Sequence, residues 1–288
     1  MQRKNSGENF WEKKIRQFEQ ELIREEKSST TIRKYMHDVR QFCLWLSQNG
    51  AENGKITKVL TIAYKQDLMD HYRISSVNSM VAAVNRFLRF CGMQQMCIKP
   101  CRTQRQYFRK EEEELTKEEY LLLVETAERT GRIRLKLLMQ TLACTGIRVQ
   151  ELTFVTVEHV REGKLEIYNK GKWRQVYLPR KLRKELLSYC ADNGISQGPI
   201  FLTFGGQVPD RVNIWYMLKR LARRAGVEEQ KVYPHNFRHL FARSYYDINR
   251  DIAHLADLLG HSNVETTRRY TLETVQAEEE TLERMGLI

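Results

Sequence analysis

The chain has 288 residues, of which 41% are hydrophobic, and it carries a formal net charge of +12 at pH 7. This length supports two domains with packed cores, and a pI near 9.4 favours a polyanionic partner. Without an apolar run near the ~18 residues that span a bilayer, and without the apolar core of a signal peptide, a cytoplasmic protein is expected.

Charge is distributed unevenly along the chain. Residues 1–105 hold 19 Lys and Arg against 10 Asp and Glu, and residues 121–270 hold 25 against 15. The intervening and the final segments are acidic instead. The predicted parts are an N-terminal domain over 1–104, a linker over 105–115, and a second domain over 116–288 that ends in an acidic tail, 271–288.

Six cysteines are scattered through the chain, which suits a reducing compartment better than a disulfide framework. Cys97 and Cys101 could provide half of a zinc site, but no second Cys or His pair with ligand spacing lies nearby. We therefore expect free thiols and neither a metal nor a cofactor.

The first domain has the pattern of a helical bundle. Trp11, Ile15, Phe18 and Leu22 recur at helical spacing. A second stripe runs from Ile32 to Leu46, after the N-cap chemistry of Ser28–Thr31 and before Gly50. A weaker helix is predicted over 62–72, and a fourth after Ser75-Ser76, from Val77 to a stop at Gly92. Basic residues on the polar faces would either contact a DNA backbone or remain solvated.

The second domain is predicted to be mainly helical with one small β-hairpin. Thr116 and Glu119 form a capping box after the charged stretch that ends at Glu114. Residues 164–168 and 173–178 are predicted strands, joined by the turn Asn169-Lys170-Gly171-Lys172. The fold class is thus mainly α, with a helical bundle followed by a mixed α/β domain.

Side chains suited to phosphate chemistry recur in a fixed order. They are Arg148 within Thr145–Leu152, His235 and Arg238 in an HxxR spacing, His261 after Leu259-Gly260, and Tyr270 after Arg268-Arg269. Arginine forks match phosphate oxygens and keep their charge. Histidine moves protons near neutral pH, and tyrosine can form a covalent intermediate. The set predicts attack of a tyrosine hydroxyl on a phosphodiester.

This constellation resembles that of the tyrosine recombinases, also called the phage integrase family. The resemblance implies a 3′-phosphotyrosyl intermediate on double-stranded DNA, formed without metal or nucleotide. It also implies that Arg148 and Arg238 clamp the non-bridging oxygens and that His261 donates a hydrogen bond to one of them. His235 would act on the tyrosine proton or organise the phosphate, and Tyr270 would be the nucleophile. Glu151 would orient a basic side chain.

The hairpin turn is similar to the family's Gly-Lys-Gly turn, whose lysine enters the minor groove and protonates the departing 5′ oxygen. The resemblance assigns this role to Lys170, with Lys172 as the competing candidate, although Asn169 stands where glycine is common. His239 and His254 have no place in the family's pattern and are interpreted as structural. The pair His235 and His239 has metal-ligand spacing but lacks a third ligand.

The resulting hypothesis is a site-specific recombinase with an Xer-like two-domain layout, acting in integration, excision or dimer resolution. A type IB topoisomerase-like relaxase and a DNA-binding regulator with a vestigial catalytic domain are the alternatives. A homotetramer on DNA is expected, with a monomer as the alternative for the free protein. The tail, with Leu272, Val275, Leu282 and Met285 among acidic residues, would either bind a neighbouring subunit or fold back onto its own domain.

Overall fold

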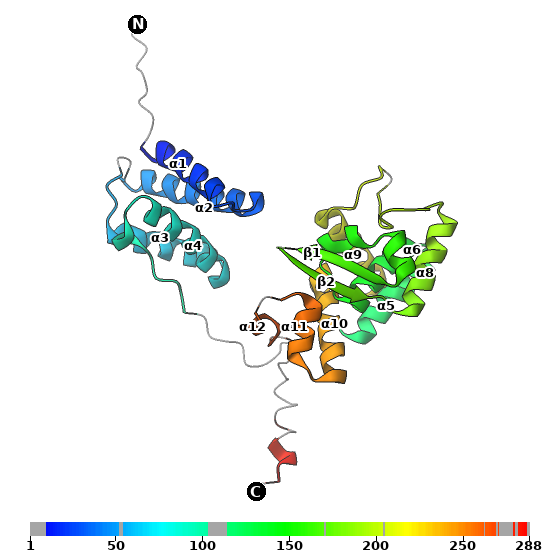
Figure 1. Cartoon of the computed structure of the whole chain (residues 1–288). Coiled ribbons are helices and arrows are strands. Elements are labelled where there is room, and N and C mark those ends of the chain that lie inside the picture. Colours follow the sequence, from blue (N-terminus) through cyan, green and yellow to red (C-terminus); the bar gives the residue numbers. More distant parts are fainter. Residues whose placement is uncertain are drawn as a thin grey trace. The chain divides into compact units, whose positions relative to one another are not determined.

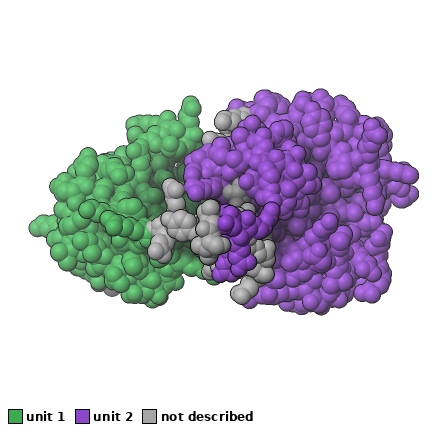
Figure 2. Space-filling view, turned by 90° about the horizontal axis from the view of Figure 1, so that it is seen from below, with its two compact units in different colours: residues 1–105 green, residues 106–288 purple. Residues whose placement is uncertain are grey.

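The computed structural model divides into two compact units, residues 1–105 and residues 106–288 (Figure 2). For Asn169 and Lys172 only the backbone is described. The described residues are 10–51, 54–102, 114–169, 171–203, 205–261, 263–268, 270, 279 and 282–286.

Unit 1 is a bundle of α-helices with a common apolar core (Figure 1). Its helices are α1 (Phe10–Arg24), α2 (Ser29–Gln48), α3 (Lys58–His71) and α4 (Ile74–Phe90), followed by the 3-10 turn η1 (Gln94–Met96). Trp11, Phe18 and Leu22 of α1 are buried as their spacing predicts. The predicted helical bundle is confirmed.

Helix starts in unit 1 follow the capping residues, with one difference from the prediction. Ser28 caps α2 by accepting a hydrogen bond from the backbone N–H of Thr31 at 3.2 Å. The fourth helix begins at Ile74, ahead of the predicted Ser75-Ser76 cap, and Arg73 at its N-cap makes no side-chain cap bond. The start of α4 is therefore not fixed by a side-chain cap.

Two asparagines hold the chain that leaves unit 1 against α4. Asn85 donates to the carbonyl of Ile98 and accepts from its N–H, both at 2.7 Å. Asn78 makes the same pair of bonds with Cys101, at 3.0 and 2.7 Å. Such paired amide bonds copy the pairing of a β-ladder, so the segment up to Cys101 belongs to the bundle.

Unit 2 packs its helices around a second core, with a two-stranded antiparallel sheet at one side (Figure 1). Thr116 and Glu119 form the predicted capping box at the start of its first helix. The elements are α5 (Lys117–Arg129), α6 (Ile133–Thr145), η3 (Val149–Phe154), α7 (Val157–Glu162), β1 (Lys164–Asn169), β2 (Lys172–Tyr177), α8 (Arg180–Asp192), α9 (Arg211–Ala225), η4 (Glu229–Lys231), α10 (Pro234–Asn249), α11 (Ile252–Leu259) and α12 (Glu265–Arg268).

The predicted hairpin is present, with Asn169 opposite Lys172 and Lys164 opposite Tyr177. Gly146 ends α6 and Gly260 ends α11, each in the left-handed conformation at φ values of +63° and +64°. These sharp ends matter because Arg148 follows Gly146 by two residues and His261 follows Gly260 directly. Among the described residues, no helix is long and apolar enough to cross a membrane.

Candidate active site

Arg148 is the N-cap residue of η3, two residues after Gly146. The Nη1 atom of Arg148 lies 3.1 Å from Oε1 of Glu151, and its backbone N–H donates to Oε2 at 2.7 Å. From β2, Arg174 reaches the same carboxylate with two bonds of 3.0 and 2.6 Å. Glu151 is 2% exposed, so it is a buried anion shared by two guanidinium groups.

Arg238 points from α10 toward the ends of α6 and α11 and is 1% exposed. Its Nη1 donates to the carbonyl of Gly146 at 2.6 Å, and its Nη2 donates to the carbonyl of Leu259 at 2.7 Å. Burial, together with the charge of Arg148, lowers the pKa of Arg238 to about 10. The guanidinium therefore stays charged at neutral pH while backbone carbonyls fix its orientation.

His261 lies within hydrogen-bond distance of Arg238, with 2.9 Å between Nε2 and Nη2. Arginine can only donate, so Nε2 accepts and the ring proton sits on Nδ1, which donates to Oγ1 of Thr267 at 2.8 Å. Burial, followed by the charges of Arg238 and Arg148, lowers the pKa of His261 to about 4. At neutral pH and without DNA, His261 is a neutral imidazole in a defined tautomer.

Tyr270 is 6% exposed and belongs to a small apolar cluster with Ala242, Leu255 and Leu259. Its ring lies parallel to that of His261, with 6.3 Å between centroids and 18° between planes. The exposed His235, at the start of α10, also acts electrostatically on His261. One unit of one chain thus brings together Arg148, His235, Arg238, His261 and Tyr270.

Lys170 lies outside the described residues, and the side chain of Lys172 is not described. The hairpin that carries both is tied to the site near its turn, because Arg174, two residues after Lys172 in β2, binds Glu151. Arg174 also lies against Gly260, where an added Cβ would approach Nη1 to 2.9 Å. Through Arg174, β2 therefore contacts the turns that carry Arg148 and His261.

The comparisons with known proteins agree over both units. A model described as the phage integrase family matches residues 113–277, and one described as the phage integrase N-terminal SAM-like domain matches residues 15–95. The chain belongs to the phage integrase family. It is 31% identical over 283 residues to the tyrosine recombinase XerA of Thermococcus kodakarensis, covering 95% of each chain.

Solved structures of integrase-family proteins share this fold. A crystal structure of XerA recombinase is 26% identical and gives a TM-score of 0.52, with 95% of this chain and 98% of that chain covered. XerH recombinase in a post-cleavage complex with its difH substrate is 19% identical, with a TM-score of 0.72 and coverages of 88% and 79%. The family and the XerA relatives make the chain a tyrosine recombinase and do not favour the topoisomerase or regulator alternatives.

Three residues of this tyrosine recombinase's site were not singled out from the sequence as site residues. Arg174 binds Glu151, Thr267 accepts from His261, and the ring of His239 contacts that of Tyr270. Only His239 carried a sequence signal, since it lies one helical turn after His235 on the same face. The other two contacts depend on the hairpin register and on the turn after α11.

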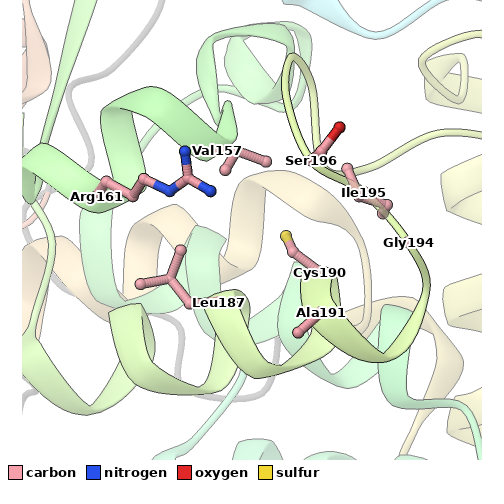
Figure 3. Close-up of a pocket in the computed structure, with 8 residues that line it drawn as sticks. All are labelled: Val157, Arg161, Leu187, Cys190, Ala191, Gly194, Ile195 and Ser196. Carbon is pink, nitrogen blue, oxygen red and sulfur yellow. The ribbon is translucent and has the colours of Figure 1, made fainter.

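A separate hollow of about 430 Å³ lies between α7, α8 and the loop after α8 (Figure 3). It contains none of the integrase-family site residues. The described cysteines, including Cys190 in this hollow, are free thiols. The described residues contain no group of His, Cys, Asp or Glu able to hold a metal. The lining residues are Val157, Arg161, Leu187, Cys190, Ala191, Gly194, Ile195 and Ser196.

Proposed function

We propose that this chain is a site-specific DNA recombinase that cuts and rejoins strands through a 3′-phosphotyrosyl bond to Tyr270. The observation that carries the proposal is the placement of Tyr270 beside a buried guanidinium and a neutral histidine of the same chain. Because the tyrosine and these groups come from one unit, we propose that each subunit cleaves with its own tyrosine.

The charge of the site suits a phosphodiester. Three guanidinium groups, those of Arg148, Arg174 and Arg238, surround the single carboxylate of Glu151 among the described residues. The surplus positive charge would bind the phosphodiester and stabilise the additional negative charge of the pentacoordinate transition state. Because Arg238 is fixed by the carbonyls of Gly146 and Leu259, little reorganisation is needed when that charge develops.

In the proposed step, the Oη atom of Tyr270 attacks phosphorus, a phosphorus–Oη bond forms, and the bond to the 5′ oxygen breaks. His235 is the candidate to receive the phenol proton. Lys170, or Lys172 in its place, supplies the proton that makes the leaving group a 5′-hydroxyl. His261 donates a hydrogen bond to a non-bridging oxygen once its ring turns from Thr267 or gains a proton. Attack by a second 5′-hydroxyl reverses the step and releases Tyr270.

We further propose that the protein acts in the cytoplasm as a homotetramer on DNA, with the tail after Tyr270 bound to a neighbouring subunit. Solved relatives that support this include a lambda integrase dimer bound to a core site and a tetramer bound to a Holliday junction. In this chain, Leu282 and Met285 are exposed by 58% and 55%, so both side chains are accessible to another surface. Residues 271–278 lie outside the described residues.

The test combines two DNA experiments. Sequencing the DNA that crosslinks to the protein in its host should reveal a short repeated site, and a plasmid with two copies of that site should recombine in vitro. A plasmid with one copy is the control, because a relaxase would remove its supercoils without exchanging partners. Relaxation of both plasmids with no recombinant product would contradict the proposal.

A further inference from the structure

His239 occupies a buried position between two residues of the proposed reaction. It is 7% exposed and lies on α10, one turn after His235. Its ring centroid is 5.0 Å from that of Tyr270, with the planes at 80°, and 4.6 Å from that of His235, with the planes at 69°. The proposed step uses the other two residues and gives His239 no part.

The spacing of residues on α10 explains how one helix contributes both to the phosphate-binding group and to the packing of the tyrosine. Residues 235, 238 and 239 are separated by three and four positions and therefore share a face. Arg238 extends from this face to the turns at Gly146 and Leu259. His239 extends from the same face to the ring of Tyr270. A rigid helix thus fixes the phosphate-binding group and the neighbour of the nucleophile relative to each other.

Tyr270 needs such a neighbour because it lies outside a regular element. The helix α12 ends at Arg268, and the backbone N–H of Tyr270 donates to the carbonyl of Thr267 at 2.9 Å. A turn of this kind limits the position of the backbone but leaves the rotation of the side chain to its packing. The perpendicular contact with His239 and the parallel arrangement with His261 constrain the plane of the phenol.

We propose that His239 is a positioning residue whose ring holds the phenol of Tyr270 in line for attack on phosphorus. The expected effect on rate rests on the proposed function, whereas the ring contact between His239 and Tyr270 does not depend on it. A misplacement of about 1 Å can cost on the order of 100-fold in rate. His239→Ala should therefore slow the formation of the covalent adduct by about 10- to 100-fold at saturating DNA, with the affinity for DNA unchanged.

The matched variants separate ring packing from other roles. His239→Phe keeps a planar ring and should recover most of the rate that His239→Ala loses. His254→Ala is the control, because His254 also stacks on a tyrosine, Tyr245, with 5.9 Å between ring centroids. Its rate should equal that of the wild type. Adduct formation is measured on a nicked duplex that prevents religation, and thermal unfolding confirms that each variant is folded.

A second readout does not depend on catalysis. In protein with ¹³C-labelled tyrosine rings, the resonance of Tyr270 is assigned with Tyr270→Phe. It should shift strongly in His239→Ala and stay unchanged in His254→Ala. A shifted resonance in a protein whose wild type forms no adduct would refute the proposed function and keep the positioning role. An unshifted resonance, an unchanged rate in His239→Ala, or an equal loss in His239→Ala and His239→Phe would each overturn the positioning role.

Discussion

At the scale of single residues, the candidate site combines fixed positive charge with one neutral histidine. Glu151 holds Arg148 and Arg174, while Arg238 is held by backbone carbonyls and by His261. Burial, and then the charge of the neighbouring Arg238 guanidinium, disfavours a protonated His261 and lowers its pKa to about 4. A bound phosphodiester would add negative charge and favour the protonated form again.

The low pKa of His261 predicts a pH dependence of stability. In the unfolded chain, histidine titrates near its ordinary value of about 6.5, so between pH 6.5 and 4 the unfolded state binds more protons. The contribution of His261 to the free energy of unfolding is therefore complete above pH 6.5 and is lost as pH falls toward 4. Urea unfolding at several pH values gives the free energy of unfolding. As pH falls, it should decrease more steeply for the wild type than for His261→Asn, whose side chain cannot titrate. Parallel curves would contradict this assignment.

Lys170→Ala tests the general acid. The variant should cleave an ordinary phosphodiester far more slowly than the wild type, because the 5′ oxygen leaves as a poor, unprotonated group. A substrate with sulfur at the 5′-bridging position should be cleaved at nearly the wild-type rate, since a thiolate leaves without a proton. Lys172→Ala is measured on the same two substrates, because Lys172 is the competing candidate for this role. Equal slowing on both substrates would remove Lys170 from this role.

At the scale of elements, the site is assembled where helices end. Gly146 closes α6 in the left-handed conformation and offers its carbonyl to Arg238. The residue is also packed tightly, since an added Cβ would lie 2.4 Å from Cδ1 of Phe241. Two features therefore require a glycine at this position: the left-handed backbone conformation and the close packing of α10 against it.

Gly146→Ala should lower the free energy of unfolding by about 2–4 kcal/mol, combining left-handed strain with a clash in the packed interior. It should also slow adduct formation, because the carbonyl that holds Arg238 must move. Gly226→Ala is the control: Gly226 closes α9 with φ of +70°, but an added Cβ would meet nothing within 4 Å. Denaturant unfolding of both variants gives the part of the lost free energy of unfolding that is due to the clash. Equal losses would show that α10 can move away at no cost.

The sequence predicted the elements better than the contacts between them. Capping at Ser28 and at Thr116 uses residues three positions apart, so the signal is local and the structure confirms it. The bond from Arg174 to Glu151 joins residues 23 positions apart, and it could not be predicted without the register of the hairpin. The contact of His239 with Tyr270 likewise needs the turn after α11. The domain limits and the catalytic roles stay predictions.

At the scale of the whole molecule, both basic units would contribute to DNA binding. In unit 1, Arg33 and Arg40 are exposed, and their spacing of seven residues puts them on one face of α2. Other cations of the bundle are already neutralised, such as Arg86 by Glu25 and Lys34 by Asp38. Arg33 and Arg40 therefore provide one exposed basic surface at which the two interpretations of the sequence, a DNA-contacting face and a solvated one, can be tested.

The double variant Arg33→Gln/Arg40→Gln should weaken DNA binding and reduce its salt dependence. Each phosphate contact contributes about 0.9 to the slope of log affinity against log salt, so the slope should become shallower by about 2. Arg86→Gln should leave the slope unchanged, because its charge is paired with Glu25. Titrations of labelled duplex at several salt concentrations provide the measurement. Identical slopes for the double variant and the wild type would exclude this face of α2 from the DNA interface.

The most direct test is to identify the residue that becomes covalently joined to DNA. A nicked duplex carrying the recombination site should trap the wild-type protein, and protease digestion with mass spectrometry should find the nucleotide on Tyr270. Tyr270→Phe should bind the duplex with nearly unchanged affinity and form no adduct, because only the nucleophilic oxygen is lost. An adduct that persists in Tyr270→Phe, or one located on Tyr245 or Tyr246, would contradict the account.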